Sequence, residues 1–148
     1  VTRYKNGEPE NNNGYVCASK GFSSSSGVDT VAYNFVFLNC EFTADEDVLP
    51  GSMSIARPWG ADSSVVTIGC HFSNAYSVLG YDGSAKSRYF DMSGVSPVVA
   101  RFYEYNNTGA VPAEEVAGMK FLTAEEAAMY TLANIFAQVN GQKDYGKA

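Results

Sequence analysis

The residues with the clearest chemical potential in this chain are Arg57 and Trp59, which flank Pro58 between two β-prone segments. An arginine side chain stays charged and can hold a carboxylate through two parallel hydrogen bonds. Trp59 is the only tryptophan, and a flat indole can stack on the apolar C–H face of a sugar ring. Two plainer readings stand beside these: a surface arginine paired with the acidic loop at 45–47, and a core tryptophan between strands.

Other nucleophiles and metal ligands are few. The three cysteines, Cys17, Cys40 and Cys70, are an odd number, so they cannot all pair within one chain. Cys40 and Cys70 are predicted to be small buried side chains on neighbouring strands, with a disulfide left open. The one histidine, His71, alternates with apolar neighbours and is expected to point outward. No metal site and no cofactor are predicted.

Glu104 lies between Tyr103 and Tyr105 in a β-prone run. Because side chains alternate along a strand, we expect Glu104 to face away from both tyrosines, outward or bonded to a loop. The next residues, Asn106-Asn107-Thr108, form a glycosylation sequon.

The elements that must position these residues are short β-prone runs broken by Gly, Asn, Ser, Asp and Pro. The run at 36–42 matches the run at 66–72 at alternating positions, and a third apolar run follows at 98–103. Equivalent strands at such intervals, with unequal loops, predict a stacked solenoid. A β-sandwich is the alternative, but none of the Asn-Gly or Asp-Gly dipeptides joins two clear strands of similar length.

The pattern changes at residue 123. Thr123 and Glu126 are spaced as a capping box, and apolar residues then recur at helical intervals up to Val139. These features predict a helix over 123–139 that ends before Gly141, followed by a polar tail over 140–148.

The composition sets outer limits. A chain of 148 residues with 45% hydrophobic and 18% charged residues indicates one globular domain. The net charge of −6 disfavours nucleic acid and anionic membrane surfaces as partners. The chain begins at Val1 without a signal peptide, and we expect a processed or excised piece of a longer protein.

Five segments in the chain together form a specific pattern: Asn12-Asn13-Gly14-Tyr15-Val16-Cys17-Ala18, Asn34-Phe35-Val36-Phe37-Leu38-Asn39-Cys40, Ala56-Arg57-Pro58-Trp59-Gly60, Tyr103-Glu104-Tyr105-Asn106-Asn107-Thr108-Gly109 and Leu122-Thr123-Ala124-Glu125-Glu126-Ala127-Ala128-Met129-Tyr130-Thr131. In this order they resemble segments of the pectin methylesterases, carbohydrate esterases whose fold is a right-handed parallel β-helix. The Arg-Pro-Trp run is similar to the family's Gly-Arg-Pro-Trp signature, with Ala56 in place of the glycine, and the resemblance extends from about Gly14 to Phe136.

The resemblance implies roles for two residues. Arg57 would hold the aspartate nucleophile, and Trp59 would contact the sugar in the substrate cleft. The family's Asp-Phe-Ile-Phe-Gly nucleophile motif and its Gln-Asp motif are both absent, since the only glutamines are Gln138 and Gln142. Tyr81 also stands where the family commonly has tryptophan.

The expected protein is therefore the C-terminal portion of one β-helix esterase domain, with β coils in 1–122, the capping helix in 123–139 and the tail in 140–148. It would act on methyl-esterified polygalacturonate, or pectin, at the cell surface or after secretion, and would be inactive alone. Its expected partners are pectin and, through the N-terminal end, either upstream coils of the same protein or a second copy. The alternative is a non-catalytic carbohydrate-binding or structural β-solenoid module of a larger secreted protein.

Overall fold

The computed structural model describes residues 4–9, 12–20 and 35–135. Short strands make up most of its regular structure, with two short helices near the C-terminal end and one 3-10 turn. The prediction of a mostly β protein is confirmed. In chain order the strands are β1 (Tyr4–Lys5), β2 (Glu8–Pro9), β3 (Gly14–Ser19), β4 (Phe35–Leu38), β5 (Glu41–Phe42), β6 (Met53–Pro58), β7 (Ser64–Ile68), β8 (His71–Phe72), β9 (Arg101–Tyr105), β10 (Thr108–Gly109) and β11 (Lys120–Phe121).

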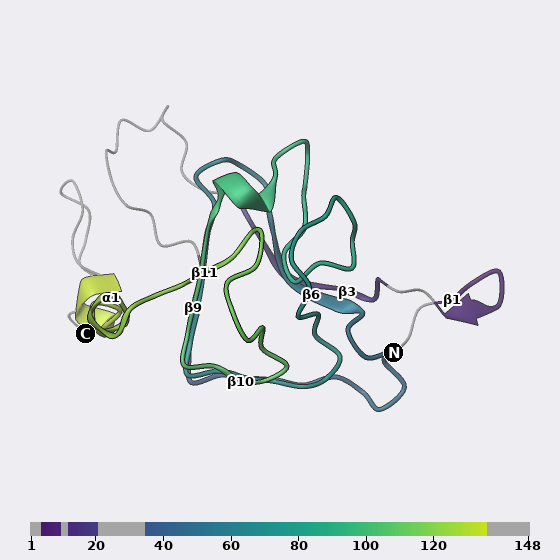
Figure 1. Cartoon of the computed structure of the whole chain (residues 1–148), viewed down its shortest axis with the longest axis horizontal. Helices are drawn as coiled ribbons and strands as arrows, with labels where there is room; N and C mark the ends of the chain where they lie inside the picture. The colour runs from purple at the N-terminus through teal and green to yellow at the C-terminus, as the bar shows by residue number, and fades with distance from the viewer. Residues whose placement is uncertain (1–3, 10–11, 21–34, 136–148) are drawn as a thin grey trace.

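Three parallel sheets organise the described chain. One contains β3 and β6, the second has the order β11-β9-β7-β4, and the third has the order β10-β8-β5. The chain visits the three sheets in the same sequence, first through β3, β4 and β5 and then through β6, β7 and β8. On the third pass Tyr76 and Tyr89 form isolated parallel bridges to β6 before the chain enters β9 and β10. Figure 1 shows the strands of successive passes lying over one another.

The sandwich alternative is wrong for the described residues, because β1 and β2 form their only antiparallel strand pair. Asn6 and Gly7 connect these two strands, with φ angles of 55° and 82°. Both residues therefore lie in the left-handed region that such a hairpin turn requires. The expectation that no Asn-Gly dipeptide joins two strands is corrected here, although each strand is only two residues long.

The register of the sheets confirms the repeat read from the sequence. Leu38 pairs with Ile68 and Phe42 with Phe72, as the alignment of the two runs predicted. The third apolar run is only partly a strand, because Pro97–Val99 forms a 3-10 turn and β9 starts at Arg101. Pro97 fixes φ at the start of that turn and Ser96 caps it by accepting a hydrogen bond from the Val98 amide.

The same two-residue corner recurs on every pass between the second and third sheets. Its first residue is Asn39, Gly69 or Asn106, with φ angles of 53°, 63° and 49°. A Cβ atom on Gly69 would lie 2.5 Å from the Asn39 side-chain oxygen below it, and Asn and Gly are the residues that adopt this left-handed backbone most readily. The second corner residue is Cys40, Cys70 or Asn107. Two cysteines therefore occupy this position on the first two passes, and an asparagine occupies it on the third.

Aromatic rings fill the space between the sheets. Phe42 and Phe72 stack with ring centroids 4.6 Å apart and planes 5° apart, and Tyr76 packs edge-on against both. Tyr89 and Phe102 form a second stacked pair, 4.7 Å apart. The first stack follows directly from the parallel register, because residues that pair across neighbouring parallel strands lie one above the other.

The C-terminal helix is shorter than expected and is interrupted. The structure has α1 (Ala124–Ala128) and α2 (Leu132–Ile135) in place of one helix over 123–139. The predicted capping box of Thr123 and Glu126 is confirmed. Thr131 interrupts the run because its hydroxyl accepts from the Asn134 amide and starts the second helix.

The apolar stripe of this helical region is not buried in the described residues. Ala128 is exposed, Leu132 is 66% exposed and Ile135 is half-buried. Without a packed face, short helices gain little from tertiary contact, which accounts for the interruption. The remaining positions of the predicted stripe, Phe136 and Val139, lie outside the described residues, as do the stop at Gly141 and the tail.

Candidate functional site

Arg57, Pro58 and Trp59 lie at the end of β6, and the alternation of the strand separates them. Pro58 is buried and pairs with Ser19 of β3, whereas Arg57 is half-buried and Trp59 is 51% exposed. The core-tryptophan reading is therefore wrong. Arg57 is the last residue but one of β6 and Trp59 follows the strand directly, so regular alternation of side chains would place the two on the same face.

The Arg57 side chain is fixed by two aromatic rings and one carbonyl group. Its guanidinium carbon lies 4.1 Å from the centroid of the Phe90 ring and 5.3 Å from that of Tyr15. Its Nε donates a hydrogen bond of 2.8 Å to the backbone carbonyl of Asp91. No described carboxylate forms an ion pair with Arg57, so the reading that paired it with the loop at 45–47 is wrong.

A close backbone contact sets the position of Trp59. The Trp59 amide donates to the Ser19 carbonyl at 2.7 Å, and a Cβ atom on Gly60 would lie 2.3 Å from the carbonyl oxygen of Lys20. Only glycine permits that approach, which explains the residue after the tryptophan. The Lys20 ammonium lies 5.5 Å from the centroid of the Trp59 ring, a cation–π contact.

The segment 88–91 supplies two of the groups that contact Arg57. Its backbone runs beside β6: the Ile55 amide donates to the Arg88 carbonyl at 2.7 Å, and Tyr89 forms a parallel bridge with Ala56. This pairing places the Phe90 ring and the Asp91 carbonyl against Arg57. The geometry of Arg57 therefore depends on whatever holds this segment in place.

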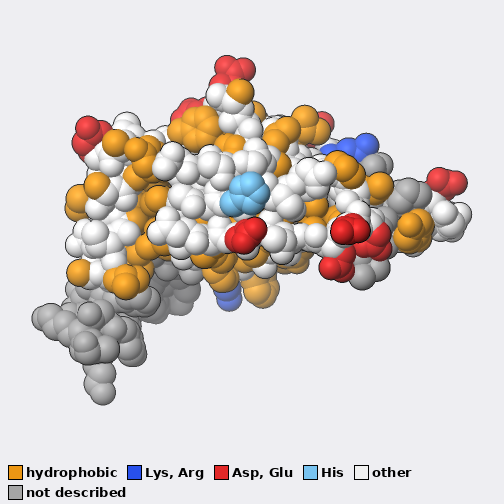
Figure 2. Space-filling view, turned by 90° about the horizontal axis from the view of Figure 1, so that it is seen from below, with side chains coloured by type: hydrophobic (Ala, Val, Ile, Leu, Met, Phe, Trp, Pro, Cys, Tyr) orange, Lys and Arg blue, Asp and Glu red, His pale blue; other side chains and the backbone are white. Residues whose placement is uncertain are grey.

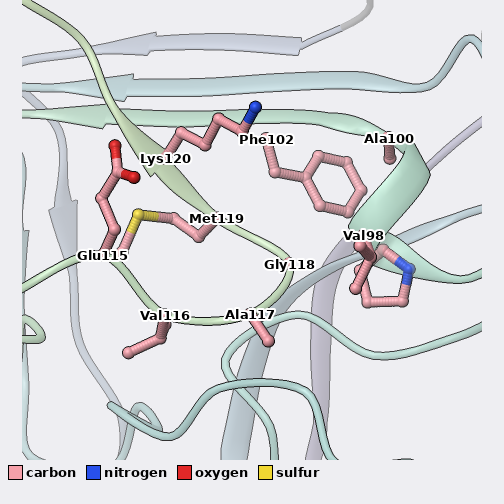
Figure 3. A pocket seen from close by; sticks show the side chains of 10 residues that line it. Val98, Ala100, Phe102, Glu115, Val116, Ala117, Gly118, Met119 and Lys120 are labelled. Carbon is pink, nitrogen blue, oxygen red and sulfur yellow. The ribbon is translucent and has the colours of Figure 1, made fainter.

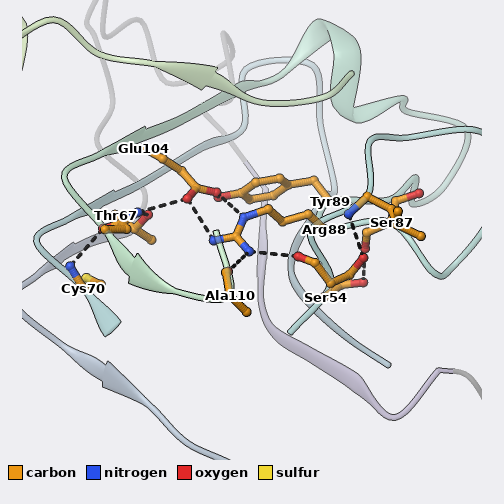
Figure 4. A network of polar contacts seen from close by, with 11 residues as sticks. Ser54, Thr67, Cys70, Ser87, Arg88, Tyr89, Glu104 and Ala110 are labelled. Atoms are coloured by element: carbon orange, nitrogen blue, oxygen red, sulfur yellow. Dashed lines mark hydrogen bonds and ion pairs between the residues drawn. The ribbon is translucent and has the colours of Figure 1, made fainter. Parts of the chain in front are cut away.

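A buried ion pair anchors the segment (Figure 4). Arg88 and Glu104 are both fully buried, with Nε–Oε1 and Nη2–Oε2 distances of 2.5 and 2.9 Å. The second terminal nitrogen of Arg88 donates to the carbonyls of Ser77 and Ala110, each at 2.8 Å. The guanidinium also lies 4.6 Å from the centroid of the Phe72 ring. Charges removed from water need this degree of pairing.

Glu104 completes the network from its own side. It accepts hydrogen bonds of 3.0 Å from the Tyr89 hydroxyl and from the side-chain amide of Asn107. Of the two orientations expected for Glu104, the outward one is wrong, whereas the bonds to Arg88 and Asn107, which lie outside the strands, agree with a glutamate bonded to a loop. On β9 the buried residues are Phe102 and Glu104, and the half-buried residues are Tyr103 and Tyr105. The alternation of side chains along β9 was predicted correctly, but the interior face was assigned to Tyr103 and Tyr105 and not to Glu104.

Tyr81 lies beside this site. Its side chain interacts with that of Asp91, the residue whose carbonyl accepts from Arg57. Desolvation, and then the Asp91 carboxylate, raise the pKa of the Tyr81 hydroxyl. Asp91 is thus a carboxylate of this chain that belongs to a residue in direct contact with Arg57, a position that the sequence did not reveal.

The cysteines and the histidine have no catalytic arrangement. All three cysteines are free thiols; Cys17 and Cys70 are buried, whereas Cys40 is half-buried. Burial raises the pKa of the Cys17 thiol to about 12, so the reactive thiolate is suppressed. His71 is exposed, as predicted, and its Nδ1 lies 3.0 Å from the Thr108 hydroxyl. Figure 2 shows this histidine on the surface of the third sheet.

The remaining features of the described chain do not add a second centre. A cavity of about 290 Å³ between Phe102 and the loop before β11 has an apolar lining, with Glu115 and Lys120 also lining it (Figure 3). The Glu115 carboxylate is bound to the Phe121 amide at 2.8 Å. No group of three acidic, cysteine or histidine side chains in the described residues is placed to hold a metal ion. No described helix has the length and apolar character needed to cross a bilayer.

Neither a scan of protein-family models nor a search of curated proteins gives a match to this chain.

The buried pair gives a first prediction. Glu104→Ala should lower the free energy of unfolding by about 3–5 kcal/mol, because it leaves the Arg88 charge buried and unpaired. The double variant Arg88→Met/Glu104→Leu should lose much less than the sum of the two single changes. Urea unfolding followed by circular dichroism measures both. The exposed Glu125→Ala is the control, with an expected change within about 0.5 kcal/mol. Additive losses would contradict the coupling.

Buried neutral acids give a second prediction. Desolvation raises the pKa values of Cys17, Tyr76 and Tyr89, so the native state keeps protons that the unfolded state releases. Their stabilisation is complete at neutral pH and is lost as the pH rises above roughly 9, by about 1.4 kcal/mol per pH unit for each retained proton. Urea unfolding at a series of alkaline pH values should show this fall. Cys17→Ala should make it shallower, and Glu125→Ala at an exposed position should not; equal slopes would contradict it.

Proposed function

We propose that this chain provides the arginine and tryptophan side of a carbohydrate esterase of the pectin methylesterase type, acting on methyl-esterified polygalacturonate. One observation carries the proposal: a guanidinium fixed by the Phe90 ring and the Asp91 carbonyl, two residues from a half-exposed tryptophan. Together with the Arg-Pro-Trp run, this arrangement supports an anion-holding group beside a sugar-stacking surface.

In this proposal Arg57 supports a carboxylate nucleophile, and no nucleophile motif recognised in this chain supplies that carboxylate. A carboxylate nucleophile attacks the methyl ester and a second carboxylic acid protonates the departing methoxide, which leaves as methanol. Water, deprotonated by that second group, then hydrolyses the acyl anhydride and regenerates the nucleophile. Arg57 keeps the nucleophile ionised and oriented through paired hydrogen bonds. Trp59 holds the sugar ring by stacking on its C–H face.

The fold proposed for this activity is a right-handed parallel β-helix. The repeated passage through the same three parallel sheets supports it, as do the two-residue corners shared by all passes. The cap that the sequence predicted over the last coil is not seen, because α1 lies to the side of the stacked strands β9 and β11 and not over them (Figure 1). The three sheets would form the faces of one solenoid whose interior is the aromatic stack.

The proposed partners follow from the edges of the sheets. At one end of the stack the described strands β3, β4 and β5, all of the first pass, pair on one side only, and β10 and β11 are the edge strands at the other end. Tyr15 and Phe35 on the first-pass strands are partly exposed. Unpaired strand edges with apolar side chains bind further strands readily. We therefore place the upstream coils of the same protein, or a second copy of this chain, at the first-pass end.

The substrate sets the proposed location. Methyl-esterified polygalacturonate is a cell-wall polymer, so an enzyme acting on it would be secreted or held at the cell surface. A second candidate function is a non-catalytic carbohydrate-binding module, favoured by the exposed Trp59 ring with Lys20 beside it. The two functions differ in whether bound pectin releases methanol.

Methanol release from methylated pectin tests the proposal. The chain alone should release no more than a blank, whereas a polypeptide that also includes the upstream coils should be active. In that longer protein Arg57→Ala should lower kcat by about 100-fold or more, because it removes electrostatic support of the nucleophile. Lys120→Ala, at an exposed cation on β11 in another sheet, is the control and should leave kcat within about twofold.

Two results would contradict this assignment. An Arg57→Ala enzyme with unchanged kcat would remove Arg57 from the reaction. Release by the chain alone that depends on Arg57 would instead reveal a nucleophile within it, and Asp91→Asn would be the first variant to make.

The exposed first-pass edge predicts association. At rising concentration the isolated chain should form dimers, because the edges of β3, β4 and β5 can pair with a second copy. Phe35→Lys should shift the chain toward monomer, since it places a charge on the edge strand β4. Leu132→Lys, at an equally apolar but more exposed residue on α2, should not. Light scattering coupled to size exclusion measures the mass; a strictly monomeric wild-type chain would oppose this prediction.

A further inference from the structure

The corner that follows β9 carries the sequon Asn106-Asn107-Thr108, which the proposed reaction does not use. A sequon has the form Asn-x-Ser or Asn-x-Thr, where x is any residue except proline, and it marks an asparagine that the secretory pathway can glycosylate. Asn106 is the only asparagine of the chain in this context. A folded chain can carry the glycan only where that side chain is free and exposed.

The two asparagines of this corner have opposite environments. Asn107 is half-buried, and its Oδ1 accepts a hydrogen bond of 2.9 Å from the Cys70 amide. Its Nδ2 donates to Thr67 Oγ1 at 2.8 Å and to the Glu104 carboxylate at 3.0 Å. Asn106 is exposed, and its side chain has no hydrogen-bond partner among the described residues. The fold therefore engages Asn107 and leaves the Asn106 amide nitrogen accessible.

The backbone presents the sequon at the surface. Asn106 has a φ angle of 49°, in the left-handed conformation that this corner repeats on every pass. Thr108, the third residue of the sequon, is exposed as well, and its hydroxyl lies 3.0 Å from His71 Nδ1. Both side chains that define the sequon thus lie outside the packed interior.

A glycan at this corner would leave the candidate site open. Trp59 lies in the connection before β7, whereas the corner lies at the far end of the second sheet, after β7 and β9. β7 has 5 residues, and at about 3.3 Å per residue it spans about 16 Å. Figure 1 shows the corner between β9 and β10 away from β6. A bulky group on Asn106 is therefore remote from Arg57 and Trp59.

The same corner leads into a free edge of the third sheet. Among the described strands β10 pairs with β8 alone, and Thr108 and Gly109 of β10 are exposed. A bulky polar group two residues before this strand blocks the approach of another strand to its edge. The first-pass strands β3, β4 and β5 contain no sequon. Glycosylation would therefore distinguish the two ends of the stack.

We infer that Asn106 is an N-glycosylation site whose glycan also closes the edge of β10. This inference rests on the secreted location in the proposed function and adds a modification to it. The Asn106 side-chain nitrogen forms a bond to C1 of a lipid-linked oligosaccharide, the lipid pyrophosphate leaves that carbon, and the nitrogen loses one proton to the transferase. The first-pass end remains open to the upstream coils or to a second copy.

Production of the 148-residue chain through a eukaryotic secretory pathway tests the site. Intact mass is measured before and after digestion with a peptide N-glycosidase, and the glycan is located by peptide mapping. The wild type should carry one N-glycan, at Asn106. Asn106→Gln and Thr108→Val should both remove it. Thr108→Ser preserves the sequon and should retain the glycan.

Asn39→Gln is the matched control for the backbone. Asn39 is exposed at the equivalent corner of the first pass, with a φ angle of 53°, and is followed by Cys40 and Glu41, which do not complete a sequon. The substitution introduces the same side chain into the same left-handed conformation and should leave the glycan in place. Thermal unfolding of both glutamine variants shows whether the fold is retained.

Light scattering coupled to size exclusion tests the closed edge. The glycosylated chain is compared with the same chain trimmed to one sugar by an endoglycosidase, so the sequence does not change. The glycosylated chain should stop at the dimer, because only its first-pass end can pair. The trimmed chain should exceed the dimer mass at the same concentration.

Each outcome decides a different claim. A wild type without a glycan, or a glycan that persists in Asn106→Gln, overturns the modification site. A glycan at Asn106 with equal assembly masses before and after trimming overturns the closed edge while the modification site stands. Methanol release by the longer protein reports on the proposed function separately. It should be the same with and without the glycan, and its absence in both forms would overturn the esterase while leaving the glycan at Asn106.

Discussion

A charge enclosed between packed sheets is tolerated only when an opposite charge and enough hydrogen bonds surround it. Arg88 and Glu104 meet that condition with a two-pronged contact, two backbone carbonyls, one hydroxyl and one amide. These partners come from β9, from the loop before it, from the corner after it and from the segment beside β6. The pair therefore fixes several parts of the chain relative to one another. Apolar contacts alone are not directional and would fix these parts less firmly.

The buried pair of Arg88 and Glu104 fixes the position of Arg57 through one short segment. Arg88 supplies the buried anchor, and two and three residues later Phe90 and Asp91 contact Arg57. The residue with the strongest chemical potential is thus held by a segment fixed through another residue's buried charge. Trp59 is placed independently, by the β3–β6 register and by the close approach of Gly60 to the Lys20 carbonyl.

Much of the fold could be predicted because periodicity is a local property. The match between the runs at 36–42 and 66–72 predicted the parallel pairing of Leu38 with Ile68, and the spacing of Thr123 and Glu126 predicted a helix start. The strand alternation around Glu104 was equally visible, but it does not say which face is interior when both faces carry large residues. Its partner Arg88 is 16 residues away in sequence, and only the fold brings the two together. The same limit applies to Asp91 and Tyr81 beside Arg57.

The corners at Asn39, Gly69 and Asn106 divide the chain into parts with different evolutionary freedom. Each pass crosses from the second sheet to the third through the same short corner, although the passes themselves differ in length. Val65 pairs with Phe35 of the pass before it and with Phe102 of the pass after it, and the second of these separations along the chain is the longer. All variation in length therefore falls in the other connections. Those connections can accept insertions, whereas a single added residue at this corner would turn the side chains of the two-residue strand that follows to the opposite face. Recombination between related chains should accordingly leave these corners intact and exchange the loops between them.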